Sequence, residues 1–168
     1  MQDHDHPTAP TPADVSFAVS LGDLTLTIAV PQLLNNGADP TVRMTSTNLS
    51  PLEHTVVYEN TGSDPTLGPR MVRALVKAGA DVDEMGPQGC TPLHQACFEG
   101  ACGEVVQALL DAGADACLPC AGHLFKTPLQ LAGCGGNPGA LRVMIGLPEY
   151  GGLNTVGPPP ERCGERVF

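Results

Sequence analysis

One group of residues has the types and spacing that suit metal or redox chemistry. Cys117 and Cys120 form a C-x-x-C pair, His123 follows closely, and Cys134 lies further along the chain. Two thiolates at this spacing can share one zinc ion, which His123 and Cys134 would complete to four ligands. A structural zinc site usually has two such pairs, and this chain has one. We therefore expect two loop thiols without metal, and keep a metal- or redox-responsive role as the alternative hypothesis.

Catalysis has less support in the sequence. His94 could act as a base toward Cys90 or Cys97, but the phosphate-loop, dinucleotide-binding, zinc-protease and serine-hydrolase motifs are missing. The glycine-rich stretch 133–139 has no strand before it and no lysine after it, so we predict a loose turn between two helices. We expect a non-enzymatic protein without a cofactor.

Composition restricts the partners. The 168 residues include 18 acidic and 8 basic side chains, which gives a formal charge of -10, and 42% of residues are hydrophobic. A surface this acidic repels phosphate groups, and we therefore expect neither nucleic acid nor a membrane as partner. The sequence shows no export signal, which predicts that the seven cysteines are reduced thiols. The expected location is the cytoplasm, and the nucleus is the alternative.

A repeated pattern indicates which elements position these side chains. Gly-Ala-Asp occurs at 37–39, 79–81 and 113–115, and the last two copies are 34 residues apart. The same offset relates two sets of apolar residues, each on one stripe of a helix: Met71, Val72, Leu75 and Val76, and then Val105, Val106, Leu109 and Leu110. The glycine after each stripe is expected to end the helix in a left-handed conformation.

A second motif precedes each stripe. Residues 91–94 (Thr-Pro-Leu-His) recur at 127–130 as Thr-Pro-Leu-Gln, and more weakly at 50–53 as Ser-Pro-Leu-Glu. A hydroxyl residue before proline predicts a helix start, because the hydroxyl caps free N–H groups and proline lacks the N–H that would have no partner. Each unit is therefore predicted to be a capped helix, a tight turn, a second helix, a glycine stop and an extended loop.

This unit resembles the ankyrin repeat, whose period is about 33 residues and whose signature, T-P-L-H-x-A, is complete at 91–96. The resemblance implies an all-α solenoid of about four stacked helix-turn-helix repeats with degenerate ends. The expected repeats span 13–45, 46–85, 86–120 and 121–153, between tails at 1–12 and 154–168. The second repeat is expected to hold an insertion at 61–69 between its helices.

The resemblance also implies a protein-binding role, because stacked hairpins leave a concave surface of first helices and loop tips. The family's partner-reading positions flank the glycine before the signature and the end of the first helix. Carried over, they are Leu49, Val57, Tyr58, Pro87, Gln88, Cys90, Phe98, Glu99, His123, Lys126 and Cys134. Tyr58 and Phe98 are expected on the solvent side of their helices, outside the apolar stripe, and aromatic side chains that become buried at an interface dominate its energetics. The alternative for Phe98 is that it folds back on a neighbouring repeat.

The expected function is that of a monomeric adaptor or inhibitor that binds another protein. Acidic residues near the expected groove, Asp83, Glu84 and Glu99, favour a basic partner segment, or else form a solvated face. Besides the metal- or redox-responsive role of Cys117, Cys120 and His123, a third hypothesis is a targeting subunit of a ubiquitin ligase or another enzyme complex.

Overall fold

The structure is a computed structural model that describes residues 32, 34–44, 47–58 and 66–147. Its helices are α3 (Pro51–Tyr58), α4 (Leu67–Lys77), α5 (Pro92–Glu99), α6 (Gly103–Asp111), the short 3-10 helix η2 (Ala121–His123), α7 (Pro128–Gly135) and α8 (Pro138–Ile145). These described residues contain no strand, and one isolated β-bridge joins Cys120 to Lys126. The predicted all-α class is confirmed.

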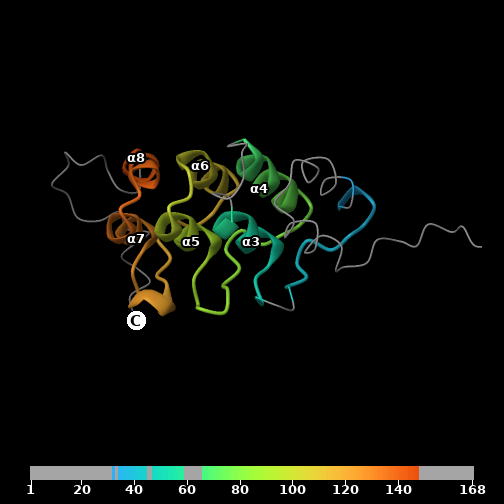
Figure 1. Ribbon diagram of the computed structural model, residues 1–168, viewed down its shortest axis with the longest axis horizontal. Coiled ribbons are helices and arrows are strands. Elements are labelled where there is room, and N and C mark those ends of the chain that lie inside the picture. Colours follow the sequence, from blue (N-terminus) through green and yellow to red (C-terminus); the bar gives the residue numbers. More distant parts are fainter. Residues whose placement is uncertain (1–31, 33, 45–46, 59–65, 148–168) are drawn as a thin grey trace, which may run out of the picture.

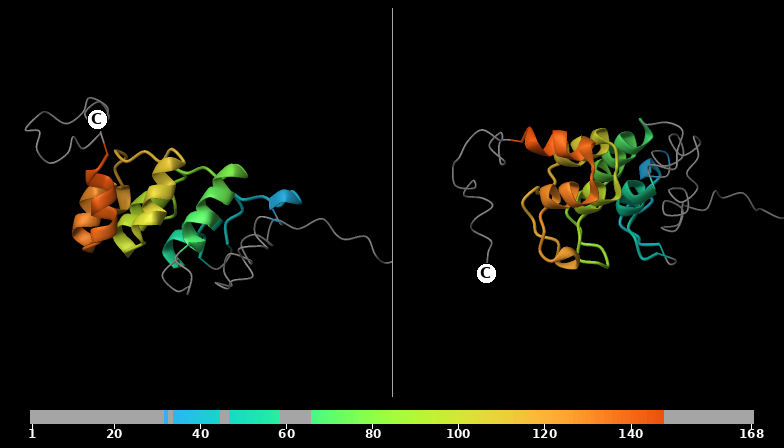
Figure 2. Two further views of the ribbon diagram at one scale, coloured as in Figure 1. Left: turned by 90° about the horizontal axis from the view of Figure 1, so that it is seen from above. Right: turned by 60° about the vertical axis from the view of Figure 1, so that its left-hand side comes forward.

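The helices form two rows. Helices α3, α5 and α7 lie side by side in one row, and α4, α6 and α8 lie side by side in the other (Figure 1). Figure 2 shows the same stack from above, where the helix pairs follow one another along the long axis. The loops that enter α5 and α7 project beyond the first row on one side (Figure 1). No helix in the described ranges has the length and apolar character needed to cross a bilayer.

The predicted caps start both α5 and α7. The N–H of Thr91 donates to Nδ1 of His94 at 3.2 Å, and the Thr91 hydroxyl lies 2.8 Å from the same nitrogen. The other ring nitrogen, Nε2, lies 2.8 Å from the carbonyl oxygen of Leu118. Since a carbonyl only accepts, the proton is on Nε2 and Nδ1 is the acceptor. In α7 the side chain of Gln130 accepts from the Thr127 N–H at 3.0 Å. His94 thus has a structural role, because both of its ring nitrogens are engaged in holding the start of α5.

Helix α3 begins with a third version of the same cap. The Ser50 N–H donates to Oε2 of Glu53 at 2.7 Å, so a carboxylate replaces the imidazole of His94. Glu53 is fully buried, and Arg43 pairs with it at 2.9 Å and with Glu84 at 2.6 Å. A buried carboxylate without a partner would be strongly destabilising, so Arg43 compensates for this substitution. It also ties its own loop to the start of α3 and to the loop that enters α5.

Glycines end the second helices as predicted. Gly37, Gly79 and Gly113 have φ values of +89°, +107° and +97°, which L side chains rarely adopt. After two of these helices, the N–H of Ala80 and of Ala114 donates 3.0 Å back to the carbonyl five residues earlier. These bonds satisfy carbonyl groups that a helix end leaves without a partner.

A continuous apolar core runs between the two rows. Of the two predicted stripes, Val76 and Leu110 are partly buried and the other six residues are buried. The side chains with almost no exposed surface are Val72, Leu75, Leu93, Ala96, Val105, Val106, Leu109, Leu131, Ala132, Ala140 and Met144. Ala96 and Ala132 carry small side chains where α5 and α7 pack against their neighbours. Burial of this kind stabilises a repeat array through its nearest-neighbour interfaces.

The predicted insertion at 61–69 is too long. Helix α4 begins at Leu67, and Gly68 and Pro69 are buried within its first turn. Proline is tolerated there because the first N–H groups of a helix have no partner within the helix. The remainder of the insertion, 61–65, lies outside the described residues.

The prediction of a loose turn over 133–139 is also wrong. Helix α7 continues to Gly135, and α8 begins at Pro138. The turn is confined to Gly136, with φ of +65°, and Asn137, whose side chain accepts from the N–H of Ala140 at 3.0 Å. Gly135 is needed inside the helix because a Cβ there would lie 2.6 Å from the carbonyl oxygen of Phe98.

The described helix pairs lie in three of the predicted repeats. Helices α3 and α4 belong to the repeat expected at 46–85, α5 and α6 to 86–120, and α7 and α8 to 121–153. Most of the first expected repeat, the last residues of the fourth, and both predicted tails lie outside the described residues.

Candidate partner-binding groove

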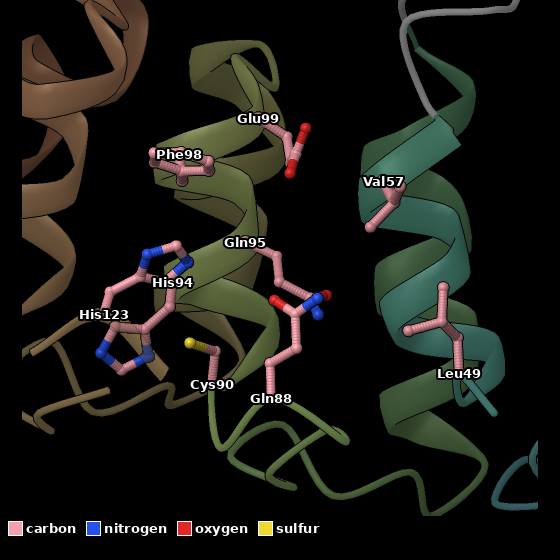
Figure 3. Close-up of a pocket in the computed structure, with 9 residues that line it drawn as sticks. All are labelled: Leu49, Val57, Gln88, Cys90, His94, Gln95, Phe98, Glu99 and His123. Carbon is pink, nitrogen blue, oxygen red and sulfur yellow. The ribbon is translucent and has the colours of Figure 1, made fainter. Parts of the chain in front are cut away.

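A groove of about 150 Å³ opens on the face formed by α3, α5 and their loops (Figure 3). It is lined by Leu49, Val57, Gln88, Cys90, His94, Gln95, Phe98, Glu99 and His123. Leu49 and Val57 come from the α3 side, and the others come from α5 and the loops beside it (Figure 3). The groove therefore joins apolar side chains to the amides of two glutamines and one carboxylate.

Most of the sequence-predicted binding residues meet at this groove. Those that line it are Leu49, Val57, Gln88, Cys90, Phe98, Glu99 and His123. Pro87 is exposed on the loop next to Gln88. Lys126 and Cys134 lie together elsewhere, with the lysine Nζ 3.2 Å from the cysteine Sγ. The side chain of Tyr58 is outside the described part of the structure.

Phe98 combines the two placements considered for it. Its side chain is 38% exposed at the groove, and its ring centroid lies 4.8 Å from that of His123, which belongs to the next repeat. The rings are tilted by 38°, within the range of favourable aromatic contacts. Phe98 is thus held by a neighbour on one side and available to a partner on the other.

Gln95 is a groove residue that the sequence prediction missed. It precedes Phe98 and Glu99 by three and four positions, so the three side chains share one face of α5. Its Oε1 atom is buried and, among the described residues, has no hydrogen-bond partner. A buried acceptor without a donor costs about 1–3 kcal/mol. The helical spacing from Phe98 was a signal that could have identified it.

The loop that enters α7 also carries exposed apolar residues that were not predicted. Leu124 is 86% exposed and Phe125 is 67% exposed. Both have left-handed backbones, with φ values of 57° and 58°, which are uncommon for large side chains. The Thr-Pro-Leu motifs at 91 and 127 are 36 residues apart, more than the repeat period of about 33, and Leu124 and Phe125 lie in the loop that takes up the difference.

The loops that enter α5 and α7 are joined by a disulfide between Cys90 and Cys120, whose Cα atoms are 4.7 Å apart. The prediction that all cysteines are reduced thiols is therefore wrong for this pair. Stacking of the repeats places the end of the loop before α5 beside η2 in the loop before α7. The Ala121 N–H donates to the Gly89 carbonyl at 3.2 Å. The Sγ atoms and a ring nitrogen of His123 all lie within 4.8 Å of one another.

The predicted metal-ligand set is thereby changed. Cys90, from the loop that enters α5, joins Cys120 and His123 in this cluster. Cys134 is exposed on α7 and contacts Lys126 instead. Cys97 is fully buried, and burial raises the pKa of its thiol to about 12, so it stays protonated.

A family model of ankyrin repeats, in three copies, matches residues 16–120. The match covers more than half of the chain. The chain belongs to the ankyrin repeat family. Helices α7 and α8, which follow the matched region, stack on α5 and α6 and extend the ankyrin array by another pair. No curated protein matches the chain.

Ankyrin repeats generally mediate protein–protein interactions and are typically not enzymes. The concave side of such an array is a recognition surface because neighbouring loops and first helices present a continuous row of side chains. The groove of this ankyrin array lies on that row, between the first helices of two successive repeats.

Proposed function

We propose that this ankyrin repeat protein is a monomeric interaction module that binds a segment of another protein in the groove beside α5. It would act as an adaptor or inhibitor, in the cytoplasm or nucleus, without catalysing a reaction. The observation that carries the proposal is the buried Oε1 of Gln95, which has no hydrogen-bond partner within the described part of the chain, next to the half-exposed ring of Phe98. Together these groups favour a ligand that supplies a hydrogen-bond donor and an apolar side chain.

The chemistry of the groove narrows the partner class. Leu49, Val57 and Phe98 offer apolar contact, and an anchor in such a pocket supplies most of the free energy of a typical interface. A backbone N–H or a cationic side chain in the groove would satisfy Gln95 once its amide turns toward the opening, because its Oε1 atom is buried in the free protein. This requirement raises specificity, since ligands without the donor leave the acceptor unpaired. An extended peptide segment provides both kinds of group at short spacing.

Charge favours a basic segment, through Glu99 in particular. Of the acidic residues considered for the groove, Glu84 pairs with Arg43. Asp83 accepts from the N–H of Asp115 at 3.0 and 3.2 Å. Glu99 is exposed and lines the groove. The formal charge of -10 adds a long-range attraction for cations, which acts mainly on the association rate.

Photo-crosslinking tests the site. Benzoylphenylalanine would replace Phe98 in the full chain, and a control chain would carry it at Gln107, which is exposed on α6 in the other row. We expect a discrete protein adduct from position 98 that is missing from position 107. The same adducts from both positions, or none from position 98, would contradict binding at the groove.

Affinity measurements with the captured partner test the groove chemistry. Phe98→Ala and Gln95→Met are each expected to weaken binding about tenfold or more, since they remove the anchor and the acceptor. Met85→Ala is the matched control, because Met85 is a 53% exposed apolar side chain outside the groove. Glu99→Gln should slow association and reduce its dependence on salt. If Met85→Ala weakens binding as much as Phe98→Ala, the groove is not the binding site.

A further inference from the structure

We propose that, in the reduced protein, Cys90, Cys120 and His123 hold a zinc ion between two successive repeats. Their three ligand atoms lie within 4.8 Å of one another, although Cys90 is 30 residues before Cys120 in the sequence. The cysteines are buried and His123 is half-buried, so an ion at this place would be largely shielded from solvent. The proposal concerns metal binding by the chain alone and does not depend on the proposed partner.

The backbone holds these ligands in position without the bond between the sulfurs. Besides the hydrogen bond from Ala121 to Gly89, the Cys120 N–H donates to the Lys126 carbonyl at 2.9 Å and closes the loop around η2. Gly122 packs against the carbonyl of Gln88 so closely that a Cβ would overlap the oxygen. The two loops are thus docked through main-chain contacts, which remain when the disulfide is reduced.

The donor set matches zinc. Zn–S distances of about 2.3 Å and Zn–N distances of about 2.0 Å place the ligand atoms of a tetrahedral site roughly 3.5–3.8 Å apart. Once the sulfurs are no longer bonded to each other, a span of up to 4.8 Å between the ligand atoms accommodates this arrangement. Two thiolates and an imidazole suit zinc and disfavour magnesium or calcium, which prefer oxygen ligands. A fourth position is left for water or for Cys117 of the C-x-x-C pair.

Neighbouring groups do not compete for the ion. Both nitrogens of His94 are engaged, Nδ1 with Thr91 and Nε2 with the Leu118 carbonyl. The thiol of Cys97 stays protonated because it is buried, and Cys134 contacts Lys126. The cluster of Cys90, Cys120 and His123 is therefore the set from which zinc would take its ligands.

The disulfide and the metal are alternative states of the same two sulfurs. A dithiol reductant delivers two electrons and two protons to the Cys90–Cys120 bond, which gives two thiols while the reductant becomes a disulfide. Zinc then displaces both protons and binds the two thiolates. The oxidised chain would be free of zinc and the reduced chain would hold it, and in both states the two loops stay connected.

Metal titration of the full chain tests the proposal. The protein would be reduced, freed of metal with a chelator, and titrated with Zn²⁺ or Co²⁺ alone. We expect one equivalent of zinc by mass spectrometry, thiolate-to-cobalt charge-transfer absorption, and a higher melting temperature with metal. The disulfide form should bind at least about a hundredfold more weakly, because its sulfurs are no longer thiolates.

Variants identify the ligands. Cys90→Ser, Cys120→Ser and His123→Ala are each expected to weaken zinc binding by about a hundredfold or more. Cys134→Ser is the matched control, because it removes an exposed thiol outside the cluster and should bind as the unaltered chain does. His123→Ala keeps both sulfurs and changes a half-buried side chain, so it should fold even if a cysteine variant does not; circular dichroism verifies this.

Two results would overturn the proposal. The reduced chain could retain its helices and bind no zinc, which would make the Cys90–Cys120 bond a structural crosslink alone. Alternatively, Cys134→Ser could weaken zinc binding as much as Cys90→Ser, which would mean that the metal binds thiols nonspecifically.

Discussion

The loops that enter α5 and α7 differ sharply, although the helices that follow them begin alike. Both helices start with the same threonine, proline and leucine. The loop before α5 is a tight turn, closed by the Gly86 N–H donating to the Cys90 carbonyl at 2.9 Å. The loop before α7 is longer and contains η2, His123 and the exposed residues Leu124 and Phe125. An ankyrin helix is thus specified by its own cap, and this leaves the preceding loop free to gain length and chemistry.

The longer loop also stores conformational strain that the shorter one avoids. Leu124 and Phe125 are consecutive non-glycine residues with left-handed backbones. Each such residue costs roughly 1–3 kcal/mol of conformational free energy. The tight loop places Gly89, with φ of +67°, at its left-handed position instead. The β-bridge between Cys120 and Lys126 and the bond to Cys90 compensate by holding the longer loop closed.

The largest expected effect separates core from loop. Leu109 is fully buried in α6, so Leu109→Ala should lower the free energy of unfolding by about 2–5 kcal/mol. Leu124→Ala removes the same atoms from an 86% exposed position and should change the free energy of unfolding by less than about 0.5 kcal/mol. Denaturant unfolding followed by circular dichroism measures both. Equal losses would show that the loop is part of the folded core.

The repeat pattern predicted the core for a physical reason. Residues such as Val72, Leu75, Val106 and Leu109 recur at one offset because α4 and α6 lie side by side and bury equivalent faces in the same core. Caps and glycine stops are local, since they depend on neighbouring backbone groups within a few residues. Both kinds of information are present in a single sequence.

The cysteine cluster could not be predicted in the same way. Cys90 was predicted as a groove residue and Cys120 as half of a C-x-x-C pair, and their proximity depends on how two loops dock across repeats. Gly135 shows a related limit: glycine in sequence favours a turn, but here the approach of the Phe98 carbonyl requires glycine within a helix. Such positions are determined by contacts between repeats.

The second prediction compares two glycines on either side of α7's start. Gly122→Ala should destabilise the fold by about 1–3 kcal/mol, because its Cβ would overlap the Gln88 carbonyl and separate the docked loops. Gly133 lies in α7 with open space around its Cα, so Gly133→Ala should stabilise by about 0.5–1 kcal/mol through helix propensity. Thermal melts of the two variants show whether each substitution raises or lowers the melting temperature. A stabilising Gly122→Ala would show that the loops are not docked as described.

The third prediction concerns the two caps. Thr91 is fully buried and contacts His94, whereas Thr127 is half-exposed and its partner is Gln130. Thr91→Ala should therefore lower the free energy of unfolding by about 1–2 kcal/mol, and Thr127→Ala should lower it by about 0.5–1 kcal/mol. Equilibrium unfolding of the two variants and of the parent measures the difference. The reverse order would mean that the caps do not differ in burial as the structure indicates.

The last and smallest expected effect is a pH dependence that the α5 cap has and the α7 cap lacks. Burial lowers the pKa of His94 below its ordinary value of 6.5, with a further contribution from the nearby charge of His123, while the carbonyls of Leu118 and Lys126 act in the opposite direction. As the pH falls below about 6.5, the unfolded chain takes up a proton before the folded chain does. Stability present above that pH is therefore lost progressively as the pH falls toward the folded pKa.

His94→Gln tests the origin of this dependence, because Gln130 shows that glutamine can complete the same cap at 3.0 Å. The variant should keep the helix and flatten the loss of stability that sets in as the pH falls below about 6.5, measured as the unfolding midpoint in denaturant. Some slope should remain, since burial also lowers the pKa of His54. An unchanged slope in His94→Gln would assign the whole dependence to other groups, and the two caps would then be equivalent in their response to acid.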